Sequence, residues 1–432
     1  MTDTHIASLH GRRVWDSRGR PTLEAEVTLA AGTRGRAIAP AGASTGSGEA
    51  LDLRDGGTEL GGYGVSRALA ALRGPIAQCL VGRDATDQTD VDRAMIALDG
   101  TPNKSHLGAN AIIAASMAVA HAAAGAAGVP LWRYLAGTSG QLAIPLPEIQ
   151  IFGGGAHAGR RVDIQDFMVV APGAASFDQA LEWTARVYLA AGALLGERNA
   201  LYGVADEGGY WPAFDNNEQG LELLLRSIER SGLEPGRDMA ISLDIAASEF
   251  GRAGRYRLGL ERRELDSDGM IELIGGWIDR YPIVSVEDPL AEDDAVGLTR
   301  FTRAFGQRIQ IVGDDFLVTD AARVRAAAAR GACNALLVKP NQAGTLTETR
   351  AALDAAREAG FGAIVSARSG ETEDVTIAHL AVGWGVGQLK VGSFTRSERM
   401  AKWNEMLRIE ESLGGSVAFA GRAPLEPPGA TR

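Results

Sequence analysis

Carboxylate side chains end several short apolar runs in the last two-thirds of the chain. Asp244, Glu287 and Asp314 each close such a run, in residues 241–244, 283–287 and 309–314. Carboxylate oxygens are the ligands that a hard cation such as Mg²⁺ prefers, whereas zinc would favour Cys or His, which these runs lack. The pattern predicts a magnesium site, with the adjacent Asp288 and Asp315 in supporting or capping roles.

Two lysines continue the pattern. Lys339 and Lys390 end the runs at 335–339 and 388–390. A lysine beside a divalent cation and a second lysine has a lowered pKa and can act as a base near neutral pH. Glu207, next to Asp206 in a glycine-rich loop, is suited to be a general acid on the opposite face. So many charges on one rim are stable only with a cation and an anionic substrate among them.

Further groups could bind that substrate. Arg368 and Ser369 offer a guanidinium and a hydroxyl for a phosphate or a carboxylate. His157 lies in a glycine-rich loop beside Arg160 and Arg161, and a functional and a packing role are both open for it. The other histidines are isolated, which favours surface or packing positions; they are His5, His10, His106, His121 and His379.

The elements that carry these residues follow from the apolar runs. The runs are short and rich in Leu and β-branched residues, as in strands buried on both faces. From Glu287 to Lys390 their polar ends are about 22 to 29 residues apart, which is one strand plus one helix each. Repeated units of this kind predict a closed α/β barrel with its active site at the carboxyl ends of the strands. The alternative, scattered surface salt bridges, does not explain why the charges fall at the same end of successive strands.

The first third of the chain has a different pattern. Residues 4–40 alternate apolar and polar residues, which predicts a three-stranded antiparallel meander. Residues 66–136 are helical in pattern, and 107–121 are so apolar that we expect a buried helix. We therefore expect an α+β domain at 1–136, with a mobile small-residue loop at 41–49 whose backbone can approach a ligand.

The rest of the chain is expected to form the barrel domain, 142–420, including a strand at 162–170, followed by a disordered tail at 421–432. The whole chain has 432 residues, a net charge of −11 and two cysteines. These values argue against nucleic acid as a partner and against a disulfide framework, and they fit a reducing cytoplasm. Since we find no leader and no apolar stretch of about 18 residues, we expect neither export nor a membrane span.

Several longer strings resemble the enolase family, in the correct order along nearly the whole chain. They are residues 14–22, 42–46, 206–209, 285–294, 313–315, 339–349, 369–374 and 396–399. The resemblance implies an N-terminal α+β domain followed by an enolase-type α/β barrel. It also implies a small phosphorylated substrate, 2-phosphoglycerate or phosphoenolpyruvate, and a homodimer or higher homo-oligomer.

The resemblance assigns roles to particular residues. Two Mg²⁺ ions are implied, the first held by Asp244, Glu287 and Asp314 and the second with help from Ser44. Lys339 would take the proton next to the substrate carboxylate, Glu207 would protonate the departing hydroxyl, and Lys390 would help bind the carboxylate. Arg368 and Ser369 would hold the phosphate. Two cations near the substrate would stabilise the enolate that this chemistry forms.

The chain departs from the family pattern on one side of this site. Ala367 and Gly48 stand where the family has histidines, and the glutamate that supports the acid is shortened to Asp166. Arg160 and Arg161 add charge to a loop that is usually small or neutral. These departures favour a diverged enzyme of a phosphonate pathway, such as a carboxyphosphonoenolpyruvate synthase using a nucleotide-activated phosphonoformate. The alternatives are an ordinary enolase that tolerates the substitutions and a catalytically silent, enolase-like binding protein.

Overall fold

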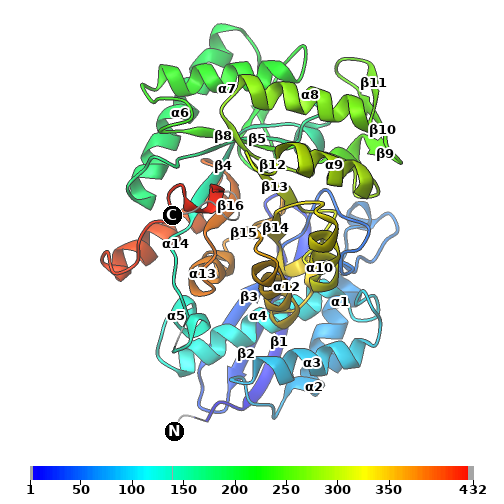
Figure 1. Cartoon of the computed structure of the whole chain (residues 1–432). Helices are drawn as coiled ribbons and strands as arrows, with labels where there is room; N and C mark the ends of the chain where they lie inside the picture. Colours follow the sequence, from blue (N-terminus) through cyan, green and yellow to red (C-terminus); the bar gives the residue numbers. More distant parts are fainter. Residues whose placement is uncertain (1–2, 139, 427–432) are drawn as a thin grey trace.

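The computed structural model describes residues 3–138 and 140–426 (Figure 1). An N-terminal sheet with its helices lies beside a strand barrel that is surrounded by helices. The fold is therefore the predicted one, an α+β part followed by a closed α/β barrel.

The N-terminal sheet is the predicted antiparallel meander. Its strands are β1 (Ile6–Trp15), β2 (Pro21–Leu29) and β3 (Arg34–Ile38), in the order β1-β2-β3. The helices that follow are α1 (Ser66–Ala71), α2 (Ala77–Leu80), α3 (Gln88–Asp99), α4 (Ala109–Ala126) and α5 (Leu131–Ala136). Helix α4 packs against β2 and β3, and its buried residues are Ala, Ile, Met and Val with only Asn110 and Ser116 polar.

Helix α4 is also long and apolar enough to cross a membrane, but 83% of its 18 residues are buried inside the protein. A helix that is apolar on all sides is expected in a protein core as well as in a membrane. The burial of α4 identifies it as a core helix, as its sequence predicts.

Eight strands close the barrel. In chain order they are β4 (Leu146–Gly153), β5 (Asp166–Val170), β8 (Ala240–Asp244), β12 (Ile283–Glu287), β13 (Gln310–Gly313), β14 (Ala335–Val338), β15 (Gly362–Ser366) and β16 (Gln388–Ser393). Hydrogen bonds between β16 and β4 complete the circle. A hairpin of β6 (Leu201–Val204) and β7 (Tyr210–Pro212) extends the sheet from β4.

One strand corrects the expectation from the βα pattern. Strand β5 is antiparallel to both of its neighbours, β4 and β8, and it begins at Asp166 rather than at residue 162. The reason is its connection: the chain between β4 and β5 contains one short 3-10 turn and no crossover helix, so it can only return antiparallel. From β8 onward the barrel strands are parallel, as predicted.

Helices surround the barrel (Figure 1). They are α6 (Phe177–Glu197), α7 (Glu218–Arg230), α8 (Ser267–Arg280), α9 (Ala295–Phe305), α10 (Ala321–Arg330), α11 (Pro340–Ala343), α12 (Leu346–Glu358), α13 (Thr376–Gly383) and α14 (Ser397–Leu413). Three of them start at an aspartate whose side chain accepts a backbone N–H of the first turn, namely Asp266, Asp294 and Asp320. Such caps satisfy donors that a helix leaves unpaired and fix where each helix begins.

Two segments bear on the site and on the predicted tail. Loop 41–49 lies on the barrel, because Ala41 pairs with Gly370 and the Ser47 hydroxyl donates to Glu292 at 3.0 Å. Its mobility stays a prediction. The predicted disorder is wrong for residues 423–425, which form a 3-10 turn that buries Leu425, and 427–432 lie outside the described residues.

Candidate active site

A small cavity gathers most of the side chains that the sequence singles out. Its volume is about 20 Å³, which is room for about one water molecule. It is lined by Ala43, Ser44, His157, Gln165, Asp166, Glu207, Asp244, Lys339, Ser366, Ala367, Arg368, Ser369 and Lys390. These residues come from the ends of barrel strands and from three loops, so the predicted placement at the strand ends is found.

The three predicted metal ligands are buried carboxylates on neighbouring strands. Asp244 and Glu287 end β8 and β12 in register with each other, and Asp314 directly follows β13. All three side chains are almost fully buried. Burial and the nearby Asp244 raise the pKa of Glu287 well above its usual value. Such crowding of like charges is costly without compensating cations.

The two lysines supply part of this compensation. Lys390 Nζ donates to Asp244 Oδ2 at 2.9 Å and to Glu287 Oε2 at 2.7 Å. Lys339 Nζ forms an ion pair with Asp314. Burial alone lowers the pKa of Lys339, but Asp314 outweighs it, so the pKa lies above its usual value. The lowered pKa predicted for Lys339 depends on a neighbouring divalent cation and stays a prediction, because among the protein groups alone the lysine pairs directly with Asp314.

The donor set fits a divalent cation. Asp244, Glu287 and Asp314 offer oxygen ligands only, which suits Mg²⁺. Glu287 Oε1 is buried and has no hydrogen-bond partner among the described residues. A buried carboxylate oxygen normally has a partner, so a ligand at this position is physically reasonable.

Asp288 shapes the backbone beside these carboxylates. Its two oxygens accept the backbone N–H groups of Asp314 and Asp315, at 3.0 and 2.8 Å. It thus has the capping position expected from sequence. Its φ of +40° is uncommon for a residue with a side chain, and strain of this kind tends to cluster at functional sites. The carboxylates of Asp288, Asp314 and Asp315 lie within 4.8 Å of one another.

A second group of titratable side chains lies on another part of the cavity. His157 Nδ1 lies 3.0 Å from Asp166 Oδ1, and His157 Nε2 lies 3.8 Å from Glu207 Oε1. Gln150 also donates to Asp166. Burial tends to lower the pKa of His157, but Asp166 and Glu207 outweigh this and raise it to about 9. With this pKa the imidazole is protonated near neutral pH and lies between two carboxylates at the cavity, and its functional role stays a prediction.

Arg368 has a carboxylate partner that the sequence reasoning missed. Its guanidinium donates to Glu49 at 2.9 and 3.2 Å, to Asn341 at 3.0 Å and to the backbone oxygen of Ser44 at 3.0 Å. Glu49 belongs to loop 41–49, so this ion pair joins the loop to the cavity. Glu49 is a charged residue among the small residues of that loop, and this charge is the sequence feature that could have pointed to its role.

Arg18 is a second missed residue. Its side chain is buried and donates to Ser369 Oγ at 3.1 Å, to the backbone oxygen of Ala41 at 2.9 Å and to Asp16 at 3.1 Å. Burial lowers its pKa from the usual value. Arg18 therefore positions Ser369 and the start of loop 41–49 together. The signal was its place in the string 14–22, which has three charged residues around a tight turn.

The structure does not bring Arg160 and Arg161 to the cavity. Arg160 Nη2 donates to Glu249 at 2.6 Å, with a largely exposed side chain. The Arg161 guanidinium lies 4.1 Å from the ring centroid of Tyr202. Both cations have partners outside the cavity, so this arrangement does not support the prediction that their charge serves the substrate.

The two positions that lack histidine differ from each other. Ala367 lines the cavity beside Arg368, so its small side chain shapes the site directly. Gly48 does not, because the Arg323 guanidinium lies where a side chain at residue 48 would begin. The Arg323 guanidinium therefore occupies the space that a side chain at position 48 would need.

Comparisons with known proteins agree with this fold. Residues 6–135 match the family model "Enolase, N-terminal domain", and residues 141–427 match "Enolase, C-terminal TIM barrel domain". A curated relative, Enolase 1 of Desulfitobacterium hafniense (strain Y51), is 47% identical over 425 residues, which cover 98% of this chain and 97% of that protein. With both domains matched in order, the chain belongs to the enolase family.

Proposed function

We propose that this enzyme interconverts 2-phosphoglycerate and phosphoenolpyruvate with the help of Mg²⁺, as an ordinary enolase does. One observation carries the proposal: a single small cavity is lined by Lys339 and Lys390 as well as by Glu207. A base, an acid and a carboxylate-binding cation around one bound molecule are what removal of water from a 2-phosphoglycerate requires. The likeness to Enolase 1 supports the same reaction.

Each residue has a task in this scheme. Ser369 and Arg368 bind the phosphate, and Lys390 binds the carboxylate. Lys339 takes the proton from the carbon next to the carboxylate, and Glu207 gives a proton to the departing hydroxyl. The protonated His157 stays beside Glu207 and keeps a proton available on that side.

The carboxylates Asp244, Glu287 and Asp314 would hold a Mg²⁺ ion, with Ser44 near a second. Bound there, the cations neutralise the carboxylate that raises the pKa of Lys339 and stabilise negative charge on the substrate. A homodimer and a cytoplasmic location belong to the same proposal, by analogy with the family.

The test is the absorbance of phosphoenolpyruvate formed from 2-phosphoglycerate, with Mg²⁺ and with excess EDTA. We expect turnover of roughly ten per second or more with Mg²⁺ and none with EDTA. A protein that binds 2-phosphoglycerate and Mg²⁺ but forms no phosphoenolpyruvate would refute the proposal. A protein that binds neither would favour the catalytically silent alternative.

Ala367 favours a second candidate. Ala367 lies beside Arg368, where the family has histidine, so the side of the site that would bind the phosphate is altered. A phosphonate-pathway reaction such as carboxyphosphonoenolpyruvate synthesis would use that change. Arg160, Arg161 and Gly48 do not line the cavity, so they no longer favour this candidate. An Ala367→His variant separates the two. A wild type slower than this variant by tenfold or more on 2-phosphoglycerate supports the second candidate, and equal rates remove it.

A further inference from the structure

A three-stranded sheet outside the barrel carries a group of exposed arginines. Its strands are β9 (Gly251–Arg252), β10 (Arg255–Leu258) and β11 (Arg263–Asp266), in the order β11-β10-β9. Tyr256 and Leu258 of β10 are buried. Successive side chains of a strand point to opposite faces, so Arg255 and Arg257 share the other, exposed face.

The register adds a third arginine to that face. Arg252 pairs directly with Arg255, so two like charges lie opposite each other on neighbouring strands. Such a pair is destabilising in the absence of a counter-charge. Within residues 3–138 and 140–426, no carboxylate lies within ion-pair distance of Arg252, Arg255 or Arg257.

The acidic residues nearby are mostly committed elsewhere. Asp266, opposite Arg255, caps α8 by accepting the N–H of Gly269 at 2.9 Å. Glu249 pairs with Arg160, and Glu261 accepts from Asn217 at 2.8 Å. Glu264, opposite Arg257, lines the groove together with Glu249, so the groove carries three arginines against two glutamates. In a chain with a net charge of −11, this face is a local excess of positive charge.

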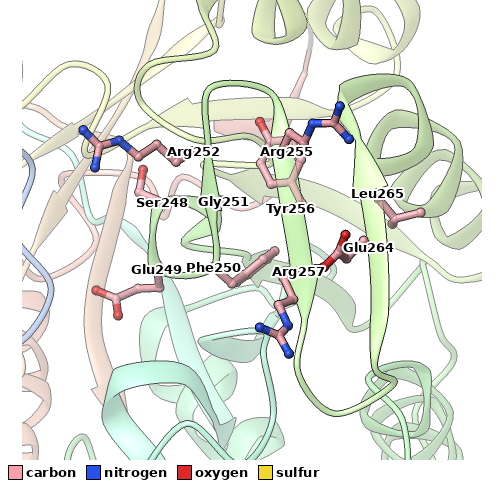
Figure 2. Close-up of a pocket in the computed structure, with 10 residues that line it drawn as sticks. All are labelled: Ser248, Glu249, Phe250, Gly251, Arg252, Arg255, Tyr256, Arg257, Glu264 and Leu265. Atoms are coloured by element: carbon pink, nitrogen blue, oxygen red, sulfur yellow. The ribbon is translucent and has the colours of Figure 1, made fainter.

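These arginines line a groove of about 650 Å³ (Figure 2). That volume lies within the range of small-molecule sites. Phe250, half-buried beside Tyr256, gives the groove a flat apolar surface. Figure 2 shows Arg252 and Arg255 at one end of the groove and Arg257 toward the other, with Phe250 between them.

We propose that this groove binds a small molecule of the nucleoside polyphosphate class. Its phosphates pair with Arg252 and Arg255 at one end of the groove, where the guanidinium groups present planar donors suited to phosphate oxygens, and Arg257 lies beside its base. Its flat base or sugar lies against Phe250. The size of the groove favours a small ligand over an acidic protein segment, and the proposal does not depend on the reaction proposed for the active site.

The test is isothermal titration with ATP in EDTA, so that no divalent cation mediates binding. We expect one ATP per chain, and affinity at least tenfold weaker in an Arg252→Ser, Arg255→Ser, Arg257→Ser variant. The matched control is Arg308→Ser, Arg325→Ser, Arg408→Ser, which removes three exposed arginines that are paired with carboxylates elsewhere. The control should change the affinity less than twofold, and thermal melts should show that both variants fold.

Two further titrations make the result specific. In an Arg368→Ala variant, ATP binding should be unchanged, whereas its loss would place ATP in the active site and overturn the proposal. Tripolyphosphate should bind at least threefold more weakly than ATP, because it lacks the part that lies on Phe250. Absence of ATP binding, equal weakening in the control variant, or tighter binding of a hexaglutamate peptide than of ATP would each overturn it.

Discussion

Replacing Lys339 by methionine tests the assigned base and separates chemistry from folding. Methionine keeps much of the length of lysine and removes the amine. General base catalysis contributes about 10²- to 10⁴-fold, which is roughly 3 to 5 kcal/mol in the barrier. Lys339 and Asp314 form a buried ion pair, and removal of one partner of such a pair costs about 3 to 5 kcal/mol of stability. The loss of stability should lie near the lower of these values, because Gln342 still donates to Asp314 at 2.9 Å.

Both quantities can be measured on one preparation. We expect kcat for phosphoenolpyruvate formation to fall at least 100-fold, a magnitude set by the loss of the base, and the substrate's α-proton to stop exchanging with D₂O. Unfolding in urea should show the destabilisation without Mg²⁺, and Mg²⁺ should restore much of it by binding the freed Asp314.

The matched control is Lys104→Met. Lys104 is also a buried lysine with a carboxylate partner, Glu348 at 2.9 Å, but it lies outside the cavity. It should lose stability and keep its kcat. The assignment of Lys339 is refuted if its variant retains a tenth or more of wild-type kcat with the α-proton still exchanging. It is also refuted if Mg²⁺ no longer stabilises the variant, because the activity loss would then reflect a collapsed site.

Three further predictions follow from buried charges. Glu49→Gln should leave Arg368 without its carboxylate partner and destabilise the free protein by about 3 kcal/mol. In thermal melts, 2-phosphoglycerate should then stabilise this variant more than the wild type. Equal stabilisation would contradict the role of Glu49. Burial, with His121 nearby, lowers the pKa of His379 to about 4. The stability that comes from burying the neutral His379 imidazole is therefore complete above about pH 6.5 and is lost as pH falls toward 4. Unfolding in urea should show about 2 kcal/mol less stability at pH 5 than at pH 7. His379→Gln should abolish most of that difference and the exposed-site control His10→Gln should not. Finally, Arg18→Met should raise KM for 2-phosphoglycerate more than it lowers kcat, since Arg18 holds Ser369 in place; a fall in kcat alone would argue against that positioning role.

The strand-end charges show how far local pattern extends. Asp244, Glu287 and Lys390 could be placed together from sequence because the carboxyl ends of parallel barrel strands meet at one face. The antiparallel direction of β5 could not be inferred from the apolar pattern of 166–170, because a buried strand reads the same in either direction. The connection before it was the only local clue.

The arginines show the limit of reasoning from residue type. Arg160 and Arg161 have the charge of an anion site, but a side chain's partner depends on which distant segments fold beside it. Glu249 and Tyr202 are far from these arginines in sequence and take both of them. Glu49 and Arg368 are the converse case, separated by more than 300 residues and paired at the cavity.

The sequence by itself determined the fold class, the family and most of the residues that line the cavity, because strand periodicity and ordered motifs are local properties of the chain. Tertiary structure alone decided which charges neutralise one another. It placed His157 between two carboxylates that raise its pKa, paired Lys339 with Asp314, and left the arginines of β9 and β10 without a carboxylate in ion-pair distance among residues 3–138 and 140–426. The physical reason is that a side chain's charge state depends on burial and on neighbours a few ångströms away, and folding brings those neighbours from any part of the chain.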